Sequence, residues 1–138
     1  IKKGKALKER FFRNLPALKK LKDRVQQASN RGFLKGIDGR RIHVRSQHAA
    51  LNTLLQGSGA IVMKQAMINL YQLIRLNTFD ARFVANIHDE WQLEVKESQA
   101  DCVGRKGVEC IEQVTDQFKM RCNLTGQYKI GGNWSETH

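Results

Sequence analysis

The sequence predicts an α+β fold in which antiparallel β-hairpins pack on long helices. Two short β-prone runs flank Asp38-Gly39, a dipeptide suited to a tight turn, and residues 82–96 form a second such pair around His88. The return run of that pair alternates apolar and polar residues, whereas the segments between the two pairs have apolar residues at helical spacing. Strands joined by short turns pair antiparallel and leave one face for helices to cover.

The first 31 residues predict two basic helices. Residues 4–13 have a short helical pattern that Pro16 interrupts, because proline lacks an N–H and suits the first turn of a new helix. The second helix runs to about Asn30 and ends before Gly32; its apolar stripe is Leu18, Leu21, Val25 and Ala28. A hairpin is predicted over 32–45, and it carries Arg40, Arg41 and Arg45.

A long helix is predicted over 47–76, with a kink or a break at Gly57 and Gly59. Its second half has the spacing of a core face, formed by Met63, Ala66, Met67, Leu70 and Ile74. We expect this half to pack on the 82–96 hairpin, in which Trp91, Leu93 and Val95 point inward. A helix over 98–121 and a last short strand in the tail from residue 127 complete a single predicted domain.

Composition excludes several classes of protein. With 138 residues, 41% apolar and 27% charged, the chain is long enough for a core and unlike disordered, collagen-like or disulfide-scaffold proteins. No apolar stretch approaches the length of a membrane span, and no secretory signal opens the sequence. Cys102, Cys110 and Cys122 lack C-x-x-C spacing, which favours a reduced, cytoplasmic protein. Because the sequence begins at Ile1, we expect a piece of a longer chain or a processed product.

The positive charge is confined to one third of the chain. Residues 1–45 hold 15 of the 24 Lys and Arg and 3 of the 13 Asp and Glu, a net charge of +12, whereas residues 46–138 have a net charge of −1. This distribution predicts a polyanionic partner, with nucleic acid ahead of a membrane surface. The alternative is that Lys19, Lys20, Lys22 and Arg24 are only the solvated face of an amphipathic helix.

Two groups of residues are candidates for chemistry or recognition. His88, Asp89 and Glu90 lie at the predicted apex of the second hairpin, where paired carboxylates suit Mg²⁺ but are also common as solvated turn residues. His48, Asn52 and Gln56 are spaced by four on a predicted helix, and their side chains suit the acceptors of the DNA minor groove or simply an exposed helix start. Arg41 and Arg45, just upstream, either clamp phosphates or decorate an exposed strand.

Four runs in order then identify a family. They are Gly39-Arg40-Arg41, AALNTLLQGSGA at 49–60, IHDEWQ at 87–92 and GGNWSETH at 131–138. Together they closely resemble the end of a DNA polymerase of family A, the polymerase I family, and the stretch from Asp38 to Ala60 is most similar to the phage replicative branch. The resemblance implies the C-terminal part of the palm of a right-hand polymerase, with adjoining fingers helices.

The resemblance also implies roles for individual residues. Asp89 matches the motif C aspartate that binds the catalytic metals, with Glu90 in support, and His88 matches a residue near the primer end. Asn52 and Gln56 match side chains that follow the primer–template minor groove, and Arg41 matches a basic residue near the DNA backbone. His48 stands where bacterial members have arginine, as in phage-like members, and His138 matches a terminal histidine near the active site.

The family needs two further motifs that these 138 residues do not contain. They are the motif A aspartate of the two-metal Mg²⁺ site and a fingers helix with Arg, Lys and Tyr for the nucleotide; Asp80, Asp101 and Asp116 have no motif around them. We therefore expect a DNA polymerase segment that is inactive alone and works with a complementary polymerase fragment, primer–template DNA and dNTP. The alternatives are a non-catalytic basic nucleic-acid-binding module and a small metal-dependent nuclease using Asp89 and Glu90.

Overall fold

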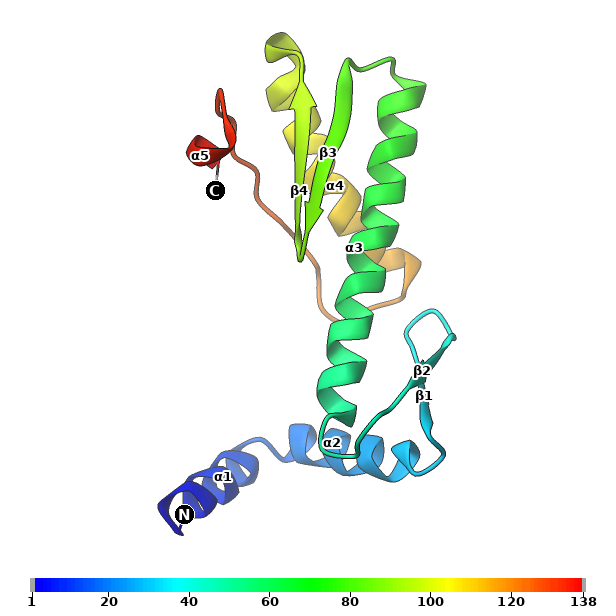
Figure 1. The fold of residues 1–138 in the computed structure, drawn as a ribbon, viewed down its shortest axis with the longest axis vertical. Coiled ribbons are helices and arrows are strands. Elements are labelled where there is room, and N and C mark those ends of the chain that lie inside the picture. Colours follow the sequence, from blue (N-terminus) through cyan, green and yellow to red (C-terminus); the bar gives the residue numbers. More distant parts are fainter. Residues whose placement is uncertain (1, 138) are drawn as a thin grey trace. The chain divides into compact units, whose positions relative to one another are not determined.

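The computed structural model describes residues 2–137 and has the α+β class predicted from the sequence. Two antiparallel two-stranded sheets alternate with helices along the chain (Figure 1). The residues divide between Gly57 and Ser58 into two compact units, which we call the N-terminal unit and the C-terminal unit. Within residues 2–137 no helix combines the length and apolar character needed to cross a membrane.

The N-terminal unit begins with two helices joined at Leu15. Helix α1 spans Lys2–Asn14 and helix α2 spans Pro16–Ser29, with the proline in the first turn of α2 as its missing N–H predicts. Strands β1 (Phe33–Lys35) and β2 (Arg41–His43) follow and pair antiparallel. A small core joins α2, β1 and the residue after β2 to the start of the next helix. It consists of Val25, Leu34, Val44 and Ala50, with Ala28, Leu51 and Leu54 packed against it.

The β1–β2 turn has the chemistry that its sequence predicts. Gly39 has φ +86°, a conformation that costs little only for glycine, and its N–H donates to the carbonyl of Gly36 at 3.0 Å. The amide of Gly36 donates in turn to the carbonyl of Arg40 at 2.8 Å, which closes the loop. The turn therefore holds β1 and β2 in register, with Arg41 opposite Lys35.

Helix α3 spans Ala50–Leu76 and corrects two expectations for the 47–76 segment. It starts at Ala50 because residues 46–49 form a tighter turn, in which the amide of Ala49 donates to both the carbonyl and the side-chain oxygen of Ser46. It is also continuous through Gly57 and Gly59, where a kink or break was predicted. Gly57 serves packing instead, since a β-carbon there would lie 3.2 Å from Cδ1 of Ile42.

The C-terminal unit is built around the second hairpin. Strands β3 (Ala81–Ile87) and β4 (Glu90–Val95) pair antiparallel, as predicted, and pack against α3 and against α4 (Ala100–Gln117) (Figure 1). Leu70 lies in this core as predicted, while Met63 and Met67 are half-buried on the same helix. The core consists of Leu70, Ile74 and Cys110, with Leu73, Phe79, Ala81, Phe83, Trp91 and Leu93 packed against it.

The end of α4 and the tail differ from the prediction. A short 3₁₀ helix, η1 (Glu97–Gln99), precedes α4, which ends at Gln117 and not at 121 because Lys119 has φ +51° and the amide of Met120 caps the carbonyl of Thr115 at 2.9 Å. The predicted tail strand does not form. The segment after α4 forms hydrogen bonds with side chains of that helix instead. The amide of Leu124, for example, donates to Thr115 Oγ1 at 2.9 Å. A last short helix, α5, spans Trp134–Thr137.

Candidate active-site turn and nucleic-acid interface

The tip of the β3–β4 hairpin carries the predicted acidic residues. Ile87 pairs with Glu90, so His88 and Asp89 form a two-residue turn with both side chains exposed. His88 has φ +54°, a left-handed conformation that non-glycine residues adopt rarely and that often marks functional turns. The turn therefore presents Asp89 to solvent at the tip of the β3–β4 hairpin.

The strands behind this turn are fixed by aromatic packing and by a bulge. The rings of Phe83 and Trp91 meet edge to face with centroids 6.3 Å apart, on the face that packs against the helices. The register shifts by one residue between Phe83 and Ala85, which leaves Val84 as the extra residue of a β-bulge. A bulge bends its strand and changes the direction of the residues beyond it, and in this strand those residues lead into the turn of His88 and Asp89.

Glu90 is oriented separately from Asp89. Paired residues share a face of a hairpin and successive residues alternate, so Glu90 and Gln92 lie on the face opposite Trp91. On that face the Nε2 of Gln92 donates a hydrogen bond to Oε1 of Glu90. The carboxylate of Glu90 is half-buried and held, whereas that of Asp89 is exposed.

The acidic turn supplies the right type of ligand for a hard cation but too few of them. Mg²⁺ prefers carboxylate and water oxygens in an octahedron, so Asp89 suits it as one ligand. Among the described residues no group of three or more His, Cys, Asp or Glu is placed to hold a metal ion. A complete site would need oxygens from outside this turn.

The basic residues of the first hairpin lie on its exposed surface. Arg41, the first residue of β2, has its guanidinium 4.7 Å from the centroid of the Phe33 ring, and Arg45 is exposed two residues after the strand ends. Stacking on an aromatic ring orients a guanidinium while leaving its N–H edges available for phosphates. The sequence interpretation missed Phe33 as the support of Arg41; its signal is the aromatic residue directly after Gly32 at the hairpin start.

Arg40, in the same hairpin, is occupied within the turn. Its Nε lies 2.5 Å from Oδ2 of Asp38, and its amide donates to Oδ1 of the same carboxylate at 3.2 Å. Desolvation acts to raise the pKa of Asp38, but the hydrogen bonds and charge of Arg40 outweigh it, so this pKa lies below its usual value. Arg40 therefore stabilises the turn, and Arg41 and Arg45 remain the phosphate candidates.

The polar residues at the start of α3 divide into two kinds. Asn52 and Gln56 are exposed on the first turns of the helix, one helical step of four apart, as predicted. His48 is also exposed but lies in the turn before α3, which corrects its placement on the helix. That turn is tied to the end of α2, because Nε2 of Gln47 donates to Oδ1 of Asn30.

The candidate residues therefore fall into two groups. Arg41, Arg45, His48, Asn52 and Gln56 belong to the N-terminal unit, and His88, Asp89 and Glu90 belong to the C-terminal unit. His138 lies outside the described residues. The turn before it is closed by Glu136, which accepts hydrogen bonds from the amide of Gly132 at 2.7 Å and from Nδ2 of Asn133 at 2.6 Å.

Comparison with known proteins identifies the family of this chain. The sequence profile of DNA polymerase family A matches residues 1–136. The chain is 35% identical to the DNA-directed DNA polymerase of Enterobacteria phage T3 and 34% identical to that of Escherichia phage T7, in each case over 99% of this chain and 22% of the relative. It is 32% identical to DNA polymerase I of Geobacillus stearothermophilus over 91% of this chain and 16% of that protein.

A solved structure agrees with the sequence relatives. The polymerase domain of Pol1 from M. smegmatis, in complex with DNA primer-template and dNTP, matches 82% of this chain and 22% of its own with a TM-score of 0.75 and 25% identity. The chain spans about a fifth of the length of the phage relatives, 22% of each. The profile, the relatives and the fold agree that this chain belongs to DNA polymerase family A.

Proposed function

We propose that this chain is the palm segment of a template-directed DNA polymerase that carries the motif C carboxylates and part of the primer–template interface. The observation that carries the proposal is the exposed Asp89 at the tip of a braced hairpin, within a chain that matches family A along residues 1–136. The reaction is nucleotidyl transfer to a primer 3′ end, with dNTP as the second substrate.

Asp89 is the residue assigned to metal binding, with Glu90 in support. Two Mg²⁺ ions, when bound, would neutralise charge that develops on the transferred phosphate and on the attacking and leaving oxygens. Asp89 would hold one side of that site, and a motif A aspartate from another segment would complete it. The hydrogen bond from Gln92 keeps the carboxylate of Glu90 oriented on the adjacent face.

The remaining candidate residues position the nucleic acid. Arg41 and Arg45 would pair with backbone phosphates, and the amides of Asn52 and Gln56 would donate to the N3 and O2 acceptors that base pairs present in the minor groove. Those acceptors are similar in all base pairs, so such contacts would depend on correct duplex geometry and not on the base sequence. His48, His88 and His138 complete the proposed set, with His88 assigned to the primer end and His138 to the vicinity of the active site.

The proposal is tested by reconstitution. The chain alone should not extend a primer, because motif A and the nucleotide-binding helix are not among its 138 residues. Joined to a family A segment that supplies both, it should extend a primer in the presence of Mg²⁺, while either part alone should not. If every such pairing binds DNA but fails to extend it, the chain is a nucleic-acid-binding module and the catalytic proposal is wrong.

A further inference from the structure

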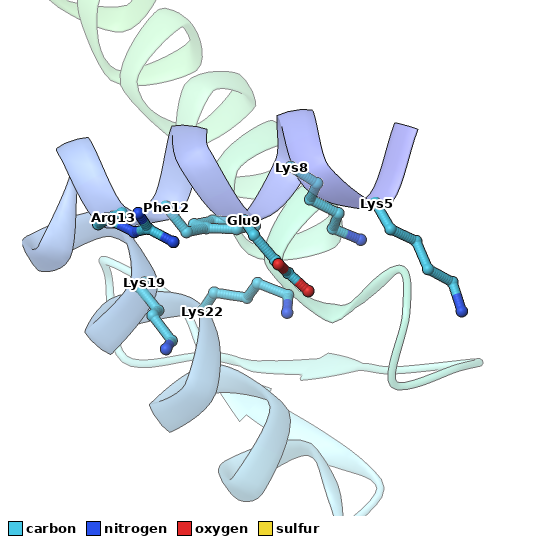
Figure 2. Close-up of a pocket in the computed structure, with 7 residues that line it drawn as sticks. All are labelled: Lys5, Lys8, Glu9, Phe12, Arg13, Lys19 and Lys22. Atoms are coloured by element: carbon cyan, nitrogen blue, oxygen red, sulfur yellow. The ribbon is translucent and has the colours of Figure 1, made fainter. Parts of the chain in front are cut away.

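A basic groove lies between α1 and α2, outside the residues assigned to the primer–template interface. Its volume is about 440 Å³, and Figure 2 shows Lys8 and Glu9 of α1 and Lys22 of α2 directed toward the same space. The groove is lined by Lys5, Lys8, Glu9, Phe12, Arg13, Lys19 and Lys22. Five of these seven side chains are cationic and one is anionic.

The cations of this groove are available to a ligand. In the described part of the chain, the ion pairs involve Asp38, Asp101 and Glu109, and none of the five groove cations takes part in one. The Nζ of Lys22 lies 5.2 Å from the centroid of the Phe12 ring, a cation–π contact between two residues that line the groove.

The sequence pattern alone did not reveal this surface. Within the basic run of α2, Lys19 and Lys22 line the groove, whereas Lys20 and Arg24 are exposed elsewhere on the same helix. The other five lining residues come from α1, on the far side of the junction between Leu15 and Pro16. The run is therefore only in part a solvated face.

We propose that this groove binds the phosphate backbone of a single-stranded nucleic acid, at a site separate from the proposed primer–template interface. Its volume is that of a small-ligand pocket and accommodates only a short stretch of one strand, not the width of a duplex. Proteins that bind single strands use a positively charged groove that follows the backbone in this way.

The lysines of the lining suit phosphates that repeat along a strand. Four of the five cations are lysines, which act as compact point charges on phosphates spaced along a strand. The bidentate fork of arginine matches carboxylates and phosphates alike, and Arg13 alone supplies one here. An acidic peptide is the alternative occupant that the experiment must separate.

The experiment measures binding of a labelled oligothymidylate to the full chain by fluorescence anisotropy, between about 50 and 200 mM salt. Each phosphate contact to a single strand contributes about 0.7 to the salt slope, so Lys8→Gln with Lys22→Gln should lower the slope by about 1.4. The same counterion release corresponds to a loss of affinity on the order of 25-fold at about 0.1 M salt. The matched control is Lys96→Gln with Lys129→Gln, which removes the same charge from exposed positions of the C-terminal unit.

A gain of affinity provides a test that misfolding cannot imitate. Glu9→Gln removes the one acidic residue of the groove and should bind the oligothymidylate more tightly than the unmodified chain, because repulsion of the phosphates is lost. Equal losses for the groove pair and the control pair, or no gain for Glu9→Gln, would overturn the proposal. Displacement of the oligonucleotide by polyglutamate of the same charge at equal concentration would also overturn it, in favour of an acidic peptide.

Duplex DNA separates this inference from the proposed function. The groove variants should weaken single-strand binding more than primer–template binding, and Arg41→Ala with Arg45→Ala should do the reverse. If the arginine variants alone fail to behave as expected, the primer–template proposal is wrong and the groove assignment stands. If the groove variants weaken both ligands by the same factor, the single-strand assignment is wrong.

Discussion

The ring of Tyr128 lies directly against Gly104 of α4, in space that a β-carbon would occupy. The tyrosine hydroxyl donates a hydrogen bond to Oδ1 of Asp101 at 2.6 Å, one helical turn from the glycine. A second close approach joins Gly126 to Ile111, where a β-carbon would lie 2.8 Å from the isoleucine Cδ1. The segment after α4 is therefore held along that helix by side chains, and it leads directly to the α5 turn.

The Tyr128 contact predicts opposite effects for two glycines of one helix. Gly104→Ala should displace the Tyr128 ring and lower the free energy of unfolding, even though alanine favours a helix. Gly107→Ala should raise it by up to about 1 kcal/mol, because its β-carbon would meet only Leu70 Cδ2 at an ordinary 3.7 Å. In urea denaturation, the free energy of unfolding of the Gly104→Ala variant should lie about 1–3 kcal/mol below that of the Gly107→Ala variant. Equal stabilisation by both alanines would contradict the contact.

The same hydrogen bond predicts that the Tyr128 phenol loses its proton at a higher pH than an ordinary tyrosine. The bond to Asp101, then burial, then the aspartate charge raise the pKa of its phenol above the usual value. The folded state thus holds this proton more tightly than the unfolded chain, so its contribution to stability is present below the unfolded pKa and is lost as pH rises through the folded pKa. The chain has two tyrosines, so Tyr71→Phe isolates Tyr128 for ultraviolet titration of tyrosinate. Adding Asp101→Asn should lower the titration midpoint; an unchanged midpoint would rule out the hydrogen bond.

The three free cysteines should differ in reactivity. Burial raises the pKa of the Cys110 thiol, with the Glu109 charge adding to it, whereas Cys122 is exposed and Cys102 is half-buried. The thiolate is the reactive form, so iodoacetamide should modify Cys122 first and Cys110 last in the folded chain. Peptide mass spectrometry over time measures the order, and the difference should vanish in denaturant. Early modification of Cys110 under native conditions would show that the core around Leu70 is open.

The stacked arginine predicts a salt-dependent DNA interface. Arg41→Ala with Arg45→Ala should lower affinity for primer–template DNA and reduce the salt slope by about 1.8, since each duplex phosphate contact contributes about 0.9. The control is Arg75→Ala with Arg82→Ala, two exposed arginines of the C-terminal unit. Isothermal titration at several salt concentrations measures both slopes. If the control substitutions lower the salt slope as much as those at Arg41 and Arg45, DNA binding depends only on the net charge of the chain and not on this interface.

The sequence predicted the β3–β4 turn well because strand alternation is a local signal. Polar and apolar residues alternate in the run after His88, and the structure confirms a turn of His88 and Asp89 between β3 and β4. The bulge at Val84 was not predicted, since its register shift arises from how two strands pair. The pattern of one strand contains no information on the number of residues opposite it.

The glycines and the tail show where local signals are insufficient. Gly57 suggested a kink, but its missing side chain admits Ile42 from the hairpin, a tertiary contact that leaves α3 continuous. The tail has strand-like residues, yet Thr125 and Tyr128 pair with Glu112 and Asp101 of α4. Side-chain contacts across 13 and 27 residues, respectively, override a weak local preference for strand.

The central claim is that Asp89 is the metal-binding carboxylate of a polymerase palm, and single-turnover primer extension by the reconstituted enzyme tests it most directly. Asp89→Asn should lower the extension rate by orders of magnitude with DNA affinity nearly unchanged, because phosphoryl transfer depends on electrostatic stabilisation at the reacting groups. Glu90→Gln should cost less, and Asp116→Asn, an exposed carboxylate on α4, should match the unmodified enzyme. An Asp89→Asn enzyme that extends primers at the rate of Asp116→Asn would contradict the account.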